Sequence, residues 1–204
     1  MVSKTVTFTT THFSDFAVVY YPVSFNDVAP DAWYKKAVGF IASRQITSGT
    51  GNGNYSPNAI ITRGEFITLL MRAYEIAPDK NPADNFTDAG NTYYTGYLAA
   101  ARRLGISYGT GNNMFSPNQA ITRQEMFTLL YNGLRAIGKL PEGKAGKSLS
   151  SFADAGSIAP WATKAMEHLA QAGIISGDGG RLNPVGTTTR AEMAQVLYNL
   201  LSDI

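Results

Sequence analysis

Three copies of the pattern Thr-Arg-x-Glu place a charged side chain where it could bind an anion. The pattern lies within Ile61–Glu65 (ITRGE), Ile121–Glu125 (ITRQE) and Thr188–Glu192 (TTRAE). Each copy precedes apolar residues at helical spacing. A threonine followed three residues later by a glutamate at such a point predicts a capping box, which starts a helix. The predicted capping residues are Thr62, Glu65, Thr122, Glu125, Thr189 and Glu192.

The arginines of the pattern are Arg63, Arg123 and Arg190, and each falls at the first position of its predicted helix. A cation is unfavourable there by about 0.3–1 kcal/mol, because the helix dipole is positive at the N-terminus. Either each arginine pairs with an acidic side chain elsewhere, or it binds an anion together with the free amides of the helix N-terminus. The two roles can hold together.

The elements that must position these residues recur three times in one order. Each repeat has a Phe-x-Asp motif, a helix, a glycine-rich loop, an aromatic residue or leucine followed by x-Pro, the capping box and a second helix. We predict helices near residues 32–45, 62–75, 93–104, 122–137, 161–172 and from 189 almost to the end. Asp31 is the expected N-cap of the first. One helix pair cannot bury its apolar face alone, whereas three stacked pairs form a core.

The repeats divide the chain into residues 25–80, 81–140 and 141–204. The fold class is therefore mainly α, with three helix-loop-helix repeats. Residues 1–24 are rich in β-branched and aromatic side chains, which predicts a short N-terminal β segment left from a preceding domain.

Composition argues against several classes of function. Among 204 residues the net charge is +2, with 16% charged residues and no clustered basic face, so nucleic acid is not an expected partner. Cysteine is absent and the two histidines lie far apart, so we expect no metal, no cofactor and no catalytic residue of these types. No apolar stretch reaches about 18 residues, which argues against a membrane span. Residues 2–21 lack signal-peptide features, so either export is signalled upstream or the protein stays inside.

Over residues 25–204 the sequence resembles the S-layer homology (SLH) family. The matching features are the Phe-x-Asp motif with an aromatic residue eight or nine positions on, the glycine-containing loop and the Thr-Arg-x-Glu box, in three copies. The resemblance implies a pseudo-threefold helical prism with the second helix of each repeat at the centre. It also implies non-covalent anchoring of an exported protein to the bacterial cell wall or S-layer. The implied partner is a secondary cell-wall polymer carrying pyruvylated N-acetylmannosamine, bound by a monomeric fragment in grooves between repeats.

By this resemblance each shared residue has an expected role. Arg63, Arg123 and Arg190 would contact the ligand carboxylate, because a guanidinium matches a carboxylate in bidentate fashion. Trp33 and Trp161 would be platforms for a sugar ring, or else core residues. The motif aspartates would accept sugar hydroxyls, or else cap the first helix or pair with an arginine; they are Asp27, Asp88 and Asp154. The loop glycines would let backbone approach the ligand, or serve turn geometry alone; they are Gly49, Gly109 and Gly177.

The repeats also differ from one another. The second repeat has Tyr93 and Tyr94 where the others have tryptophan, and three residues depart from the usual box, namely Gly64, Gln124 and Thr188. These differences predict three unequal grooves.

Two other functions remain open from sequence. A glycan-active enzyme needs one asymmetric pair of acids, whereas the acids here recur symmetrically, which favours multivalent binding over catalysis. A helical-repeat scaffold for protein interactions at the cell surface is the main alternative.

Overall fold

A computed structural model describes residues 21–80, 82–142 and 146–202, and within them the fold is mainly α, as predicted. The predicted β segment lies outside the described residues, except for 21–24, which have no regular structure. The helices are α1 (Lys35–Ser43), α2 (Arg63–Ala73), α3 (Thr95–Arg103), α4 (Arg123–Ala136), α5 (Pro160–Gln171) and α6 (Arg190–Ser202), with short 3₁₀ turns η1 (Leu149–Ser151) and η2 (Ala155–Ser157).

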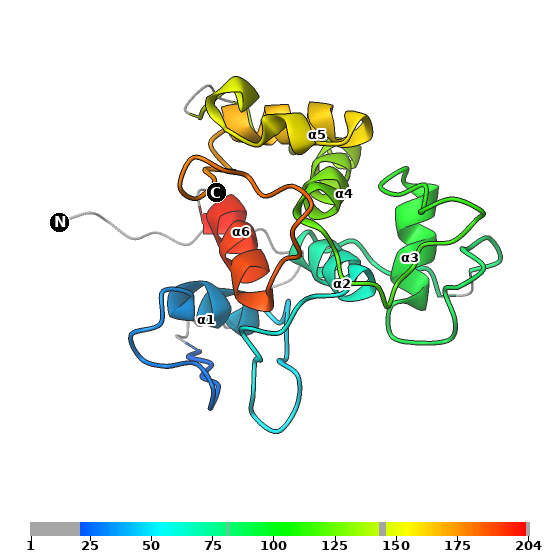
Figure 1. Cartoon of the computed structure of the whole chain (residues 1–204). Coiled ribbons are helices and arrows are strands. Elements are labelled where there is room, and N and C mark those ends of the chain that lie inside the picture. Colours follow the sequence, from blue (N-terminus) through cyan, green and yellow to red (C-terminus); the bar gives the residue numbers. More distant parts are fainter. Residues whose placement is uncertain (1–20, 81, 143–145, 203–204) are drawn as a thin grey trace, which may run out of the picture.

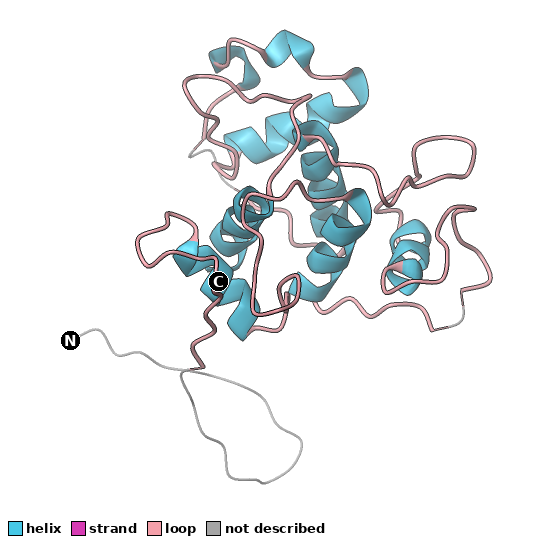
Figure 2. Ribbon diagram, turned by 60° about the horizontal axis from the view of Figure 1, so that its bottom comes forward, coloured by secondary structure: helices cyan, strands magenta, loops and turns pink. Residues whose placement is uncertain are grey.

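The helices form a central group with an outer helix packed against each member (Figure 1). The second helices of the repeats, α2, α4 and α6, are central, and α1, α3 and α5 lie outside them. Each central helix takes its outer partner from a different repeat, because α2 packs on α3, α4 on α5, and α6 on α1. In the described part of the chain, Figure 2 shows helices and the loops that join them. The first and last repeats therefore close the arrangement into a ring.

A cycle of backbone hydrogen bonds joins the three repeats at the centre. The amide of Ile61 donates to the carbonyl of Thr188 (3.0 Å), Ile121 donates to Ile61 (3.1 Å) and Thr188 donates to Ile121 (3.3 Å). These are the residues directly before the three capping threonines, and all three are fully buried. The cycle brings the N-termini of α2, α4 and α6 together around a pseudo-threefold axis.

The apolar residues after each box form the core, as their helical spacing indicates. Phe66, Met126 and Met193 follow the three glutamates and have no exposed surface. Leucines four residues further on, such as Leu70 and Leu130, are equally buried. Burial of this stripe stabilises the fold through the hydrophobic effect.

The first helix begins later than predicted, and Asp31 is not its N-cap. Helix α1 starts at Lys35, and Tyr34 occupies the capping position without a side-chain hydrogen bond. The amides of Ala32 and Lys35 each donate a hydrogen bond to the carbonyl three residues earlier, so this stretch forms turns before the helix. A capping residue must stand directly before the helix, so Asp31 is too far away. No helix in the described part of the chain has the length and apolar content to cross a bilayer.

Candidate ligand-binding grooves between repeats

Capping boxes start the three central helices. Thr62 Oγ1 accepts a hydrogen bond from the amide of Glu65, and Glu65 Oε2 accepts one from the amide of Thr62 at 2.8 Å. The same reciprocal pair occurs at Thr122 and Glu125 at the start of α4. It recurs between Thr189 and Glu192 at the start of α6.

The second carboxylate oxygen of each glutamate pairs with an arginine from another repeat. Glu125 Oε1 lies 2.8 Å from Nη1 of Arg63. The equivalent distances are 3.3 Å between Arg123 and Glu192 and 3.2 Å between Arg190 and Glu65. Each glutamate therefore caps its own helix and neutralises the arginine of the preceding repeat in the ring. Sequence reasoning assigned only the first role, although an arginine at a helix N-terminus was the signal that an acid should lie nearby.

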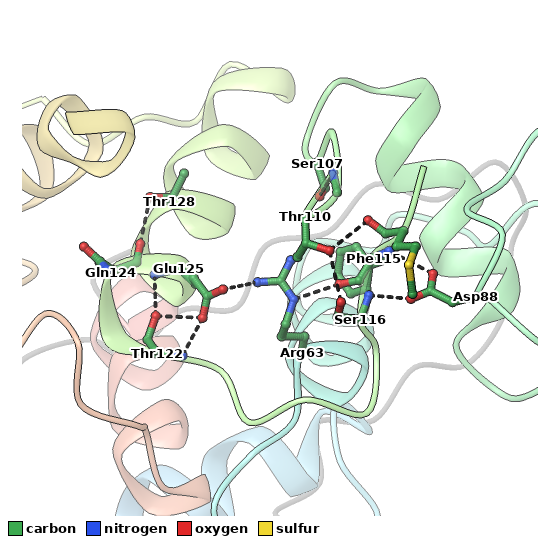
Figure 3. Close-up of polar contacts among 12 residues, drawn as sticks. Arg63, Asp88, Ser107, Thr110, Phe115, Ser116, Thr122, Gln124, Glu125 and Thr128 are labelled. Carbon is green, nitrogen blue, oxygen red and sulfur yellow. Dashed lines mark hydrogen bonds and ion pairs between the residues drawn. The ribbon is translucent and has the colours of Figure 1, made fainter. Parts of the chain in front are cut away.

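A backbone carbonyl holds each guanidinium from a second side. Nε of Arg63 donates to the carbonyl of Phe115 at 2.8 Å, which fixes the guanidinium between that backbone and Glu125 (Figure 3). Nε of Arg123 donates to Leu182 and Nε of Arg190 to Tyr55, both at 2.9 Å. Burial lowers the pKa of Arg63, and the charge of Glu125 opposes this effect.

Part of each guanidinium stays accessible. The arginine side chains are only 5%, 17% and 5% exposed for Arg63, Arg123 and Arg190. In the described chain Nη2 of each arginine has no hydrogen-bond partner. These three atoms are nevertheless not buried, because the one buried side-chain polar atom without a partner in that part of the chain is Thr188 Oγ1. Solvent therefore reaches these Nη2 atoms. The predicted pairing of each arginine with an acid is therefore confirmed, while ligand binding by the accessible part stays a prediction.

The motif aspartates hold the loop that receives the arginine. Asp88 accepts hydrogen bonds from the amides of Phe115 (2.8 Å) and Ser116 (2.7 Å), and the carbonyl of the same Phe115 accepts from Arg63. Asp27 binds the amides of residues 55 and 56 in the same way, and Asp154 those of residues 182 and 183. Burial disfavours the charge of Asp27, but the amides outweigh this and lower its pKa, as they do for Asp154. These carboxylates position the arginines through the loop, a role that sequence reasoning did not include.

The free helix amides expected to assist anion binding are not free, and that expectation is wrong. The amides of Arg63 and Gly64 donate to the carbonyls of Gln119 and Pro117, at 2.9 and 2.8 Å. The starts of α4 and α6 are blocked in the same way by the carbonyls of residues 186, 184, 59 and 57. Because the loop of the next repeat in the ring covers each helix N-terminus, an anion cannot bind to these helix amides.

The loop glycines are required by turn geometry. Gly49, Gly109 and Gly177 have φ angles of +83°, +82° and +68°. A Cβ at Gly109 would clash with the carbonyl oxygen of Met114 and would lie 2.8 Å from a ring carbon of Phe86. The phenylalanine of the Phe-x-Asp motif thus packs under its loop where only glycine fits.

Three grooves result, and each combines residues from three repeats. The Arg63 groove is lined by Arg63, Gly109 and Trp161, and has a volume of about 520 Å³. The Arg190 groove, lined by Arg190, Gly49 and Tyr93, measures about 490 Å³. The Arg123 groove, lined by Arg123, Gly177 and Trp33, measures about 820 Å³. None of the three motif aspartates lines these grooves.

An exposed aromatic residue stands at each groove. Trp33 is 62% exposed, Tyr93 58% and Trp161 57%. Tyr34 and Tyr94 support the first two by edge-on contacts with ring centroids 5.1 Å apart. Core packing, the alternative considered for the tryptophans, does not occur at these positions. Tyr93 takes the place of tryptophan in the second repeat.

Comparison with known proteins agrees with the threefold pattern. The S-layer homology domain matches this sequence at residues 24–67, 85–127 and 151–194, which together exceed half of its length. The chain belongs to the S-layer homology domain family.

Relatives of this SLH protein include both enzymes and S-layer proteins. It is 35% identical over 98% of its length to an amylopullulanase of Thermoanaerobacterium thermosulfurigenes, and 34% identical over 88% to the exoglucanase XynX of Acetivibrio thermocellus. It is 29% identical over 85% of its length to the S-layer protein sap of Bacillus anthracis. The chain spans only 10%, 16% and 21% of the lengths of these relatives. Family membership and the S-layer relatives indicate a cell-surface anchoring module.

The structure explains two of the residues that depart from the usual SLH box. A Cβ on Gly64 would lie 3.0 Å from the carbonyl oxygen of Pro117 and from the ring of Tyr94, so the absence of a side chain permits this close approach. Gln124 is buried, and its Oε1 accepts a hydrogen bond from the amide of Ala159 directly before α5.

Among the described residues, no cluster of three or more histidine, aspartate or glutamate side chains could hold a metal ion.

Proposed function

We propose that this SLH protein anchors an exported protein to the bacterial cell wall by binding an acidic secondary cell-wall polymer, a pyruvylated glycan, in its three grooves. One observation carries the proposal. An arginine, a glycine-containing loop and an exposed aromatic ring from three different repeats meet in one groove, and the combination occurs three times.

The chemistry of each groove suits a sugar that carries a carboxylate. The accessible edge of the arginine can donate hydrogen bonds to the ketal carboxylate. Because Glu125 and a backbone carbonyl already fix Arg63, little side-chain entropy is lost when the ligand binds. The aromatic face can cover the apolar side of the sugar ring.

The glutamates of the grooves are poorly suited to catalysis. Each accepts a hydrogen bond from a capping amide through Oε2 and pairs with an arginine through Oε1, as Glu65 does with Thr62 and Arg190. A general acid must reach the glycosidic oxygen of the substrate, whereas both oxygens of each of these carboxylates are already engaged within the protein. Three linked sites of modest affinity instead increase the avidity for a repeating polymer.

The aromatic residues offer the cleanest test on the protein side. They are exposed, so replacing Trp33, Tyr93 and Trp161 with alanine should leave the helical circular dichroism and the melting temperature nearly unchanged. The affinity for purified pyruvylated polymer, measured by calorimetry, should fall about tenfold or more. Tyr21→Ala is the matched control, since Tyr21 is 70% exposed but lines none of the three grooves. Unchanged binding by the triple variant would contradict the proposal.

The ligand side needs its own test. Wild-type protein should bind the polymer strongly only while its pyruvate is present, and removing the ketal should weaken binding sharply. Arg63→Lys should also weaken binding, because lysine retains the charge but lacks the planar fork. Equal binding to the two polymers would refute carboxylate recognition, and retention only on walls that still contain protein would favour the interaction scaffold.

A further inference from the structure

The three grooves differ at one equivalent position of their central helices. The tenth residue of each helix lines the groove, and it is Arg72 in α2, Asn132 in α4 and Asn199 in α6. Two grooves therefore carry a neutral amide where the Arg190 groove carries a second guanidinium.

Arg72 is available to a ligand. It is exposed, and no acidic side chain of the described residues forms an ion pair with it. Its Nε donates to the hydroxyl of Tyr97 at 3.4 Å, and its guanidinium lies 5.8 Å from the centre of the same ring. Tyr97 belongs to α3, so contact with a neighbouring repeat holds Arg72 beside the groove.

The second arginine changes the charge of this groove relative to the others. The lining of the Arg190 groove has two arginines against one glutamate, Glu65. The Arg63 groove has one arginine against one glutamate. In the Arg123 groove, Arg181 is matched by Asp178, so two cations face two anions. Among the three, only the Arg190 groove has an excess of positive charge.

The exposed aromatic residue of the Arg190 groove, Tyr93, shares the lining with Glu65 and both arginines. Burial raises the pKa of Tyr93, as does the charge of Glu65, while Arg190 and Arg72 both oppose the rise. Arg72, Tyr93 and Arg190 also line the same groove. One ligand stacked on this ring could contact both guanidinium groups.

We infer that the Arg190 groove is specialised for a doubly anionic segment of the wall polymer, with one carboxylate at Arg190 and a second anionic group at Arg72. This inference rests on the proposed function. The second group is a carboxylate or a phosphate, since a guanidinium binds either through charge-assisted hydrogen bonds. The other two grooves accept singly charged segments.

The test compares glycan fragments with one or two anionic groups. Calorimetric titrations use a fragment with a single pyruvate ketal, one with two carboxylates, and one with a ketal and a phosphate. Wild-type protein should have one site that binds a doubly charged fragment about tenfold more tightly than the single-ketal fragment. Comparing the dicarboxylate with the ketal-phosphate fragment identifies the second group.

Two variants assign this preference to a residue. Arg72→Asn gives the groove the amide found in the other two, so the tenfold preference should disappear while binding of the single-ketal fragment stays the same. Asn199→Arg adds the same charge to the Arg123 groove and should create a second preferring site. Asn199 is exposed, and in the described chain its side chain bonds to that of the partly buried Gln195, so both variants should fold.

The outcomes separate this inference from the proposed function. If wild-type protein binds no pyruvylated fragment, the proposed function fails. If it binds all three fragments equally, or if Arg72→Asn weakens all of them equally, the proposed function stands and the inference about Arg72 is overturned.

Discussion

Thr188 introduces a buried hydroxyl without a partner at the centre of the ring. The residue is fully buried, and its Oγ1 is the one buried side-chain polar atom in the described chain that lacks a hydrogen bond. The equivalent positions hold Ile61 and Ile121, both fully buried. Valine has the same shape as threonine and is also β-branched, so Thr188→Val removes the hydroxyl without altering the backbone preference. An unsatisfied buried polar group costs about 1–3 kcal/mol, and we expect Thr188→Val to recover about 1–2 kcal/mol of it.

The gain should appear in equilibrium unfolding. The free energy of unfolding in urea should rise by about 1–2 kcal/mol, and the melting temperature by about 2–8 °C for a domain of this size. Thr187→Val is the matched control, because Thr187 is the exposed neighbour and its replacement should change stability by less than about 0.5 kcal/mol. If Thr188→Val is neutral or destabilising, the hydroxyl is satisfied in solution and the account of the axis is refuted.

Three further predictions concern the residues that build the grooves. Glu125→Gln should lower the free energy of unfolding in urea titrations by about 1–3 kcal/mol, because glutamine can still cap its helix but leaves the buried cation of Arg63 unpaired. A loss of stability no larger than that of an exposed substitution would contradict the pairing. Gly109→Ala should cost about 2 kcal/mol or more in thermal unfolding, because φ is +82° and the new methyl group meets the Met114 carbonyl; an unchanged melting temperature would show that the loop can relax. Asp27 and Asp154 have folded-state pKa values below the ordinary 3.8, so their stabilising contribution is present above that pH and is lost as the pH falls through the lowered values. The doubly substituted Asp→Asn protein should therefore be less stable at pH 5 by about 1 kcal/mol per site, with a shallower loss of stability between pH 5 and pH 2; parallel pH profiles would argue against this role.

Contacts between repeats explain how each central helix tolerates a cation at its N-terminus. Each arginine is compensated by the glutamate of another repeat and by a loop carbonyl, and that loop is in turn held by an aspartate, as in the series Asp88, Phe115, Arg63 and Glu125. Since every repeat supplies an arginine to one neighbour and a glutamate to the other, removing one repeat would leave a cation and an anion unpaired. The ring is therefore required for the grooves as well as for the core.

Local patterns made much of this predictable from sequence. Capping boxes act over three residues, and amphipathic helices over four, so the six helices and their starts at Thr62, Thr122 and Thr189 could be inferred without tertiary information. The threefold recurrence likewise predicted equivalent arginines, loop glycines and aromatic residues. Asp31 failed as an N-cap because turns that no periodicity indicates precede α1.

By itself, the sequence determined the repeat, the helices, the family and the types of side chain available to a ligand, because these follow from short-range spacing. Only the tertiary structure decided which glutamate meets which arginine, since Arg190 and Glu65 lie 125 residues apart in the sequence and meet only when the ring closes. The same closure covers the helix amides with loop carbonyls and brings an aromatic residue of one repeat to the arginine of another. These contacts depend on how three similar units pack around an axis, and no pattern within a single unit specifies that packing.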